Sequence, residues 1–144
     1  MSIKYIKVKS NISESNLKFL YHILKHRKFN ISHNSMPSFE EHKKFVISNP
    51  YINWFIVTKN EFKIGSVYLN QDNSIGLNIL EEYRHTLSEL ILDLENKLNP
   101  QKEVKSIISR NSFYNVSPKD VFFINTLKKL GYEVSKISFR KIET

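Results

Sequence analysis

The pattern of hydrophobic and polar positions alternates along the chain between a helical and an extended spacing. Hydrophobic residues recur every three or four positions in four segments, which is the spacing of one face of a helix. These segments cover residues 13–27, 38–49, 87–98 and 117–130. The sequence therefore predicts four amphipathic helices.

Polar residues at the predicted helix ends support these boundaries. Ser38 and Thr86 each precede a glutamate three residues further on, which is the spacing of a capping box. Ser117 is the expected N-cap of the last helix, with Asp120 in its first turn. Gly131 follows that helix, where glycine readily adopts the left-handed conformation that ends helices.

β-branched and aromatic residues dominate the segments between the helices. The predicted strands cover residues 3–8, 53–58, 62–69, 74–80, 113–116 and 134–142. Tight turns at 59–61 and 71–73 predict an antiparallel meander, whereas residues 103–109 fit either a strand or a short helix. Helices and strands thus mix around one sheet with an antiparallel centre, which defines an α+β (mixed α/β) domain.

The composition fits one globular domain over residues 1–144. Hydrophobic residues make up 40% of the chain, enough for a single core, and the absence of cysteine excludes disulfides and thiolate chemistry. No apolar run reaches the length of a membrane span, and the first residues lack the apolar stretch of a signal peptide. We therefore expect a cytoplasmic protein. No His, Asp and Glu spacing forms a recognisable metal site.

The net charge of +8 is the compositional feature that suggests a nucleic-acid partner. Lysine outnumbers arginine 18 to 4, whereas proteins that read phosphates and bases favour the arginine fork. The excess of lysine, isoleucine and asparagine is also consistent with an AT-rich genome. We therefore expect the charge to attract an anionic small molecule more than a nucleic acid.

The segment EEYRHTLSEL, residues 81–90, follows one predicted strand and opens a predicted helix. A strand, a short turn and a helix start form a phosphate cradle in many proteins, because free N–H groups and the positive end of the helix dipole face outward. Such turns usually carry glycines, and this one has none. The segment therefore predicts either a phosphate site without glycines or a capped turn.

Three segments, in the same order, resemble the GCN5-related N-acetyltransferase (GNAT) family. Residues 35–57 contain Glu-Glu-His-x-x-Phe before Pro-Tyr-x-x-Trp, similar to members that acetylate amino sugars carried on nucleotides. Residues 62–79 resemble the family's third and fourth strands with their Ile-Gly and Gly-hydrophobic patterns. Residues 115–141 resemble its Asn-x-x-Pro and Lys-Leu-Gly ending. The resemblance implies a twisted, mostly antiparallel central sheet with helices on both faces.

The resemblance also implies an activity. We expect an N-acetyltransferase that uses acetyl-CoA as co-substrate and a small amine as acceptor, preferably an amino sugar linked to a nucleotide. Arg84 matches the start of the family's cofactor motif, but the motif's glycines would fall on Leu87 and Glu89 or be deleted, and its frequent acid tyrosine would fall on Leu127. These departures favour a second hypothesis, a binding module that has lost catalysis. A basic nucleic-acid-binding domain is a third, and the oligomeric state stays open.

The resemblance implies cofactor contacts from the fourth strand, the turn after it and the start of the last helix. The residues are Asn78, Ile79, Leu80, Arg84, His85, Thr86, Asn115 and Asp120. The strand backbone would bind the pantetheine arm, and the turn would meet the pyrophosphate. Helix capping alone would explain Thr86 and Asp120, and Arg84 would equally suit a solvated surface.

The acceptor would contact the loop after the first helix and the centre of the sheet. The residues assigned to it are Arg27, His33, Tyr51, Trp54 and Tyr68. Their aromatic rings would stack on a base or a sugar, although aromatic residues in strands commonly belong to the core.

Five residues are candidates for the general base of the reaction. They are His33, His42, Glu81, Glu82 and His85. His33 and Glu81 are preferred, because one lies in the expected acceptor loop and the other follows the fourth strand. His42 lies on the apolar face of its helix and suits a packed histidine.

Overall fold

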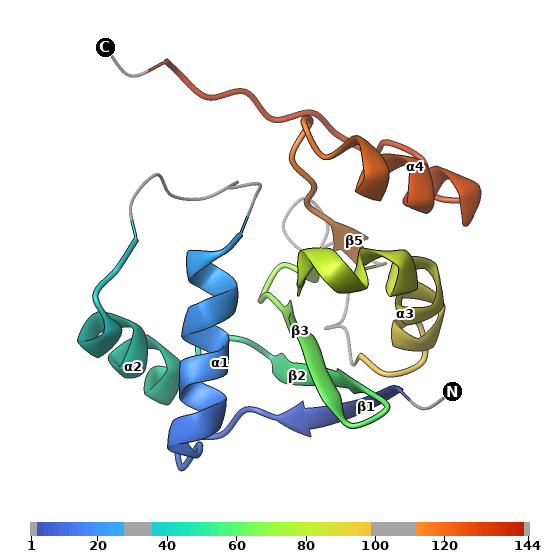
Figure 1. Ribbon diagram of the computed structural model, residues 1–144. Helices are drawn as coiled ribbons and strands as arrows, with labels where there is room; N and C mark the ends of the chain where they lie inside the picture. Colours follow the sequence, from blue (N-terminus) through green and yellow to red (C-terminus); the bar gives the residue numbers. More distant parts are fainter. Residues whose placement is uncertain (1–2, 28–35, 99–111, 143–144) are drawn as a thin grey trace.

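A five-stranded sheet forms the centre of the protein, and helices precede and follow its strands along the chain (Figure 1). The computed structural model describes residues 3–27, 36–98 and 112–142. The strands are β1 (Ile3–Lys7), β2 (Asn53–Lys59), β3 (Phe62–Leu69), β4 (Ser74–Ile79) and β5 (Phe113–Tyr114). The α-helices are α1 (Glu14–Lys25), α2 (Phe39–Ser48), α3 (Leu87–Leu94) and α4 (Val121–Lys129). A 3-10 helix, η1 (Glu81–Thr86), runs directly into α3.

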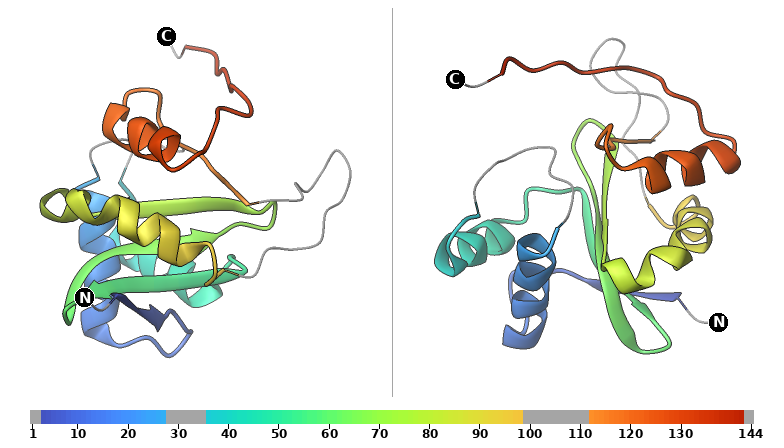
Figure 2. Two further views of the ribbon diagram at one scale, coloured as in Figure 1. Left: turned by 90° about the vertical axis from the view of Figure 1, so that its right-hand side faces the viewer. Right: turned by 45° about the horizontal axis from the view of Figure 1, so that its top comes forward.

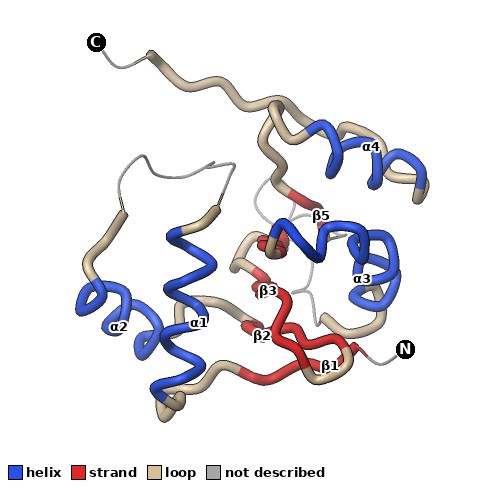
Figure 3. The backbone as a smooth tube through the Cα atoms, viewed as in Figure 1, coloured by secondary structure: helices blue, strands red, loops and turns tan. Residues whose placement is uncertain are grey.

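The strands, red in Figure 3, form one sheet in the order β1-β2-β3-β4-β5. Neighbours among the first four are antiparallel, whereas β5 lies parallel to β4. Asn60, Glu61 and Asn73 have φ angles of 50°, 71° and 70° in the two tight turns, a conformation that asparagine tolerates better than most residues. The predicted antiparallel meander is therefore confirmed.

Helices cover both faces of the sheet (Figure 2). On one face, Leu17 of α1 and Val46 of α2 pack with Ile56 of β2. On the other face, Leu90 of α3 packs with Val57, and α4 extends that layer by packing against α3. Ile56 and Val57 are consecutive and completely buried on opposite faces, because successive side chains of a strand alternate. The predicted α+β architecture is confirmed.

Two capping boxes were predicted, and one of them forms. At α2 the Ser38 hydroxyl oxygen accepts from the Glu41 N–H, and the Glu41 carboxylate accepts from the Ser38 N–H, both at 3.1 Å. At α3 the prediction is wrong. Thr86 instead donates its hydroxyl to the Tyr83 carbonyl at 2.7 Å, and Glu89 accepts from Lys59 of β2 at 2.9 Å. Because η1 leads into α3 without a break, Thr86 is itself helical, with φ −88° and ψ 0°.

The last helices begin and end at positions that differ slightly from the predicted ones. Asp120, predicted inside the first turn of α4, is its N-cap and accepts from the Phe123 N–H at 3.2 Å. Ser117 accepts from the Lys119 N–H in the turn before it. Gly131 has the expected left-handed conformation, with a φ of 93°. α3 ends at Leu94 and not at residue 98.

The predicted strand over residues 134–142 is absent. Lys136 of this segment still contacts β5, with its Nζ 4.3 Å from the Phe113 ring centroid. The later residues extend away from the body of the protein (Figure 1), and Phe139 and Ile142 are 93% and 85% exposed. A strand requires a ladder of hydrogen bonds with a neighbour, and no described residue supplies one to this segment. β5 is likewise limited to two residues, shorter than the predicted 113–116. The ambiguous segment 103–109 lies outside the described residues.

Candidate functional site

β4 and β5 pair only at their first residues and then separate. Their ladder joins Ser74 to Phe113 and Ile75 to Tyr114 and ends there. The rest of β4 pairs with β3 along its other edge. A gap therefore opens between the carboxyl ends of two parallel strands, which is a common location for a ligand site in open sheets.

The backbone groups of β4 alternate between β3 and this gap. Leu80 donates its N–H to Ile64 of β3 at 2.9 Å, whereas the Asn73 carbonyl accepts from the Phe113 N–H on the β5 side at 3.3 Å. Because these directions alternate along a strand, Leu77 and Ile79 direct their N–H and C=O groups into the gap. Of the strand residues assigned to the cofactor, Ile79 thus presents backbone groups there.

A cavity occupies the gap and extends from the end of α1 to the start of α4. Its lining residues are Ile23, His26, Arg27, Leu77, Asn78, Ile79, Leu80, Glu81, Arg84, Asn115, Val116, Ser117, Asp120 and Phe123. Eight of the residues singled out in the sequence meet here. They are Arg27, Asn78, Ile79, Leu80, Glu81, Arg84, Asn115 and Asp120. The cavity therefore joins residues predicted for cofactor, acceptor and base.

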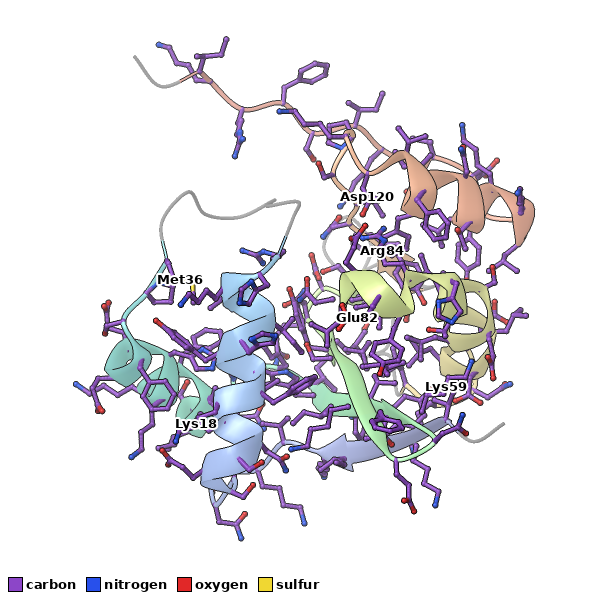
Figure 4. All side chains as sticks on the ribbon, in the orientation of Figure 1. Lys18, Met36, Lys59, Glu82, Arg84 and Asp120 are labelled. Atoms are coloured by element: carbon purple, nitrogen blue, oxygen red, sulfur yellow. The ribbon has the colours of Figure 1, made fainter. Side chains whose placement is uncertain are left out.

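Arg84 and Asp120 form an ion pair across the outer end of the cavity. One guanidinium nitrogen, Nη2, lies 2.7 and 2.9 Å from the two carboxylate oxygens, and Figure 4 shows the two side chains pointing toward each other from η1 and from the start of α4. The side chains are 19% and 8% exposed. The Phe122 ring centroid lies 5.5 Å from the guanidinium carbon. This pair joins the segment after β4 to the segment after β5.

A second cavity lies beside the first and shares Glu81, Arg84 and Asp120 with it. Its other lining residues are His85, Lys119, Val121 and Phe122. Arginine, histidine and lysine side chains thus meet at the start of α4, a combination that suits an anionic ligand. Thr86 lies away from both cavities, because its side chain is buried and bonded to Tyr83.

The two positions where the family motif has glycines direct their side chains away from the site. Leu87 is buried in the core between α3 and α4. Glu89 pairs with Lys59 of β2, and neither residue lines the cavity. Neither side chain occupies the cavity. The lack of glycine therefore does not by itself obstruct the approach of a ligand to η1.

The three aromatic residues assigned to the acceptor form one cluster beneath α1 and α2. The Tyr51 and Tyr68 rings stack with centroids 4.2 Å apart and an interplanar angle of 19°, and Tyr51 meets Trp54 edge-on at 4.9 Å. Trp54 is a core residue, 6% exposed. Burial raises the pKa of Tyr51 and of Tyr68, and the charge of Arg27 partly opposes that rise. Both phenols are therefore protonated, neutral donors near neutral pH.

The base candidates occupy different environments. His42 is buried between α1 and α2, where burial lowers its pKa, and its Nε2 has no hydrogen-bond partner among the described residues. Glu81 lines both cavities and His85 the second, whereas Glu82 lines neither. His33 lies outside the described residues. His42 is thus the packed histidine that its position on the helix predicted.

Sequence reasoning missed several residues of the site. Leu77, His26 and Phe123 line the first cavity, and Lys119 lines the second. His26 is the C-cap of α1, and Phe123 is a buried residue of α4. The available signal was the Pro118-Lys119-Asp120 sequence, which places a cation at the helix start beside Arg84.

No helix among the described residues is both long and apolar enough to cross a membrane. Within residues 3–27, 36–98 and 112–142, no three side chains of the types that ligate metals come together as a metal site would require.

No protein-family model and no curated protein sequence matches the chain. Solved structures do match. The N-acetyltransferase PseH of Campylobacter jejuni, in complex with acetyl coenzyme A, superimposes with a TM-score of 0.60 and 14% identity over 95% of this chain and 92% of its own. AAC(6')-Iy, with the bisubstrate analog CoA-S-monomethyl-acetylneamine, matches with a TM-score of 0.59 and 13% identity over 100% of both chains.

A third match is a GNAT family acetyltransferase of Streptococcus pneumoniae TIGR4. Its TM-score is 0.54, with 11% identity over 99% of this chain and 100% of the other. At such low sequence identities the matches establish a similarity of fold alone. The protein has the fold of the GCN5-related N-acetyltransferases, as the three sequence segments predicted.

Proposed function

We propose that this protein transfers the acetyl group of acetyl-CoA to the amino group of a small molecule. The observation that carries the proposal is the cavity between the separated strands β4 and β5, with Arg84 at its outer end. Matches to structures determined with acetyl coenzyme A and with a CoA bisubstrate analog support the same ligand.

The residues present fit acetyl-CoA. Its pantetheine arm carries amides, and the backbone groups of Leu77 and Ile79 that face the gap match them as a neighbouring strand would. Its phosphates match the cations of Arg84 and Lys119 and the imidazole of His85 in the adjoining cavity. Because salt screens the attraction between these cations and the phosphates, binding is expected to weaken as salt rises.

The chain's own part in the reaction is to orient the amine and to remove its proton. Acetyl-CoA supplies an acyl group that is already activated as a thioester. Glu81 is the proposed general base among the described residues, because it lines the cavity directly after β4. His33 is a second candidate from the segment after α1. A Leu77 or Ile79 N–H is the proposed donor to the thioester oxygen.

The preferred acceptor is an amino sugar linked to a nucleotide. Arg27 lines the cavity from the α1 side and acts electrostatically on Tyr51 and Tyr68, so a cation lies beside two stacked rings. A cation suits a nucleotide phosphate and aromatic rings suit a base or a sugar. Trp54 would support these rings from the core rather than contact the acceptor.

The proposal is tested first by ligand binding and then by turnover. Saturable binding of acetyl-CoA should raise the melting temperature, because a ligand that binds only the folded state stabilises it. Arg84→Ala should weaken binding about tenfold or more, the loss of one charge-assisted phosphate contact. Arg140→Ala, on the exposed C-terminal segment, is the matched control. No binding at millimolar CoA would contradict the proposal.

A binding module without catalysis is the second candidate function. It is favoured by Leu127, which is packed in the core between α3 and α4 and offers no hydroxyl to the cavity. Binding of CoA without acetylation of any compound in a broad panel of amines would support this second function against the first.

A further inference from the structure

The phenol ring of Tyr68 crosses β4 directly over Gly76. The two residues are paired across β3 and β4, so their side-chain positions lie on the same face of the sheet. A Cβ atom at residue 76 would lie only 2.0 Å from Cζ and 2.5 Å from Oη of Tyr68. The ring therefore occupies the space that the side chain of any amino acid other than glycine would need at position 76.

This ring lies over the residue of β4 that immediately precedes the cavity lining. Gly76 follows Ile75, the last residue of β4 that pairs with β5, and precedes Leu77, the first residue of β4 that lines the cavity. The ring is on the face that α1 covers, and Ile23 of α1 and Arg27, just beyond the end of α1, line the cavity. Arg84 lines the cavity beyond the other end of β4. Tyr68 and Arg84 thus lie beside opposite ends of the part of β4 that lines the cavity.

The ring of Tyr68 is held in place from behind. Tyr51 stacks on it with centroids 4.2 Å apart, and Trp54 supports Tyr51 at 4.9 Å. Phe45 closes the cluster, 5.8 Å from Tyr51 and 6.0 Å from Trp54. Moving the ring would require several packed aromatic residues to move with it. The ring is therefore held in a fixed position beside the first residue of β4 that lines the cavity.

We infer that Tyr68, admitted by Gly76, sets the length of the acyl group that the site accepts. The inference rests on the proposed function, in which the phosphates lie near Arg84 and the arm follows β4 from Leu80 toward Leu77. The acyl group then lies beside Gly76, and each further methylene group must enter space that the ring fills. A rigid pocket discriminates against one extra methylene by about tenfold or more.

Calorimetry without acceptor tests the inference, since it compares affinities for CoA, acetyl-CoA, propionyl-CoA and butyryl-CoA directly. The wild-type protein should bind acetyl-CoA about tenfold or more tightly than butyryl-CoA. Tyr68→Val should remove or reverse that preference. Tyr68→Phe, which keeps the ring and loses the hydroxyl, should retain the wild-type order.

The outcomes separate the inference from the proposed function. Wild-type protein that binds acetyl-CoA and butyryl-CoA equally well overturns the inference and leaves the proposed function in place. A folded Tyr68→Val protein that keeps the wild-type preference does the same. Absence of binding by all four ligands overturns both. Should Tyr68→Val fail to fold, as judged by near-UV circular dichroism, the wild-type comparison alone still decides.

Discussion

Arg84 and Asp120, 36 positions apart in the sequence, meet with one guanidinium nitrogen within 2.9 Å of both carboxylate oxygens. Asp120 has a second task, since the same carboxylate caps α4 by accepting from the Phe123 N–H. One side chain therefore starts a helix and fixes the charge at the outer end of the cavity.

These two tasks can be separated by substitution. Asp120→Ala removes the cap and the partner of a largely buried guanidinium, and should lower the free energy of unfolding by about 2 kcal/mol. Asp120→Asn keeps a good N-cap and loses only the charge, so the cost should be about half as large. Urea denaturation measures both, with the exposed Asn125→Ala in α4 as control. Equal costs for the two variants would contradict the division.

Gly76→Ala should destabilise the protein by about 1–3 kcal/mol, because the added methyl group overlaps the Tyr68 ring. The same substitution in the Tyr68→Val background should cost less, since the overlapping ring is gone. Gly131→Ala is a useful comparison, because that position has open space and a φ of 93°, so its cost of about 1 kcal/mol comes from backbone strain alone. A double-mutant cycle with no coupling between residues 68 and 76 would refute the overlap.

His42 should make stability depend on pH. Burial disfavours the imidazolium and places the folded-state pKa below the ordinary 6.5. As pH falls through 6.5 the unfolded chain therefore takes up a proton that the folded chain does not, and stability decreases until the lower, folded-state pKa is reached. His42→Leu should flatten this part of the profile between pH 7 and 5. Denaturation at a series of pH values measures it, and a profile that is the same for the wild-type protein and His42→Leu would contradict the prediction.

The C-terminal segment should contribute little to the stability of the isolated chain. Val134, Ile137, Phe139 and Ile142 are 65–93% exposed and lie in no ladder of the described sheet. A chain that ends at Glu133 should therefore unfold within about 0.5 kcal/mol of the full chain. Thermal unfolding of the two chains at several concentrations makes the comparison. A large loss would show that the segment packs somewhere in solution.

The sequence predicts features that depend on neighbouring residues better than features that depend on distant ones. Ser38 and Thr86 carry the same capping signature, yet only Ser38 forms the box, because η1 already continues into α3 and Lys59 of a distant strand takes Glu89. The strand expected at 134–142 failed for a similar reason. Its composition suits a strand, but a strand exists only with a partner.

The candidate site shows the same division. The turn with Arg84 was readable from its place between a strand and a helix, and so was Asp120 at a helix start. Their pairing was not readable, because it depends on how α4 packs over the end of β4. The contact of Tyr68 with Gly76 follows from the register of β3 and β4. The lengths of the two strands and of their turn determine this register, but the register could not be read from the sequence.

The short ladder between β4 and β5 also bears on how the native protein opens. β5 pairs with the sheet only at Ser74 and Ile75, and α4 is attached through α3 and the Arg84–Asp120 pair, whereas β2 and β3 pair along their whole lengths. Amide hydrogens of α4 should therefore exchange with solvent through a partial opening that leaves β2 and β3 closed. The cavity lies between β4 and β5, so a ligand that contacts both sides of it would slow amide exchange in α4 most. Amide protection in α4 would therefore report whether a ligand occupies the cavity, without any measurement of turnover.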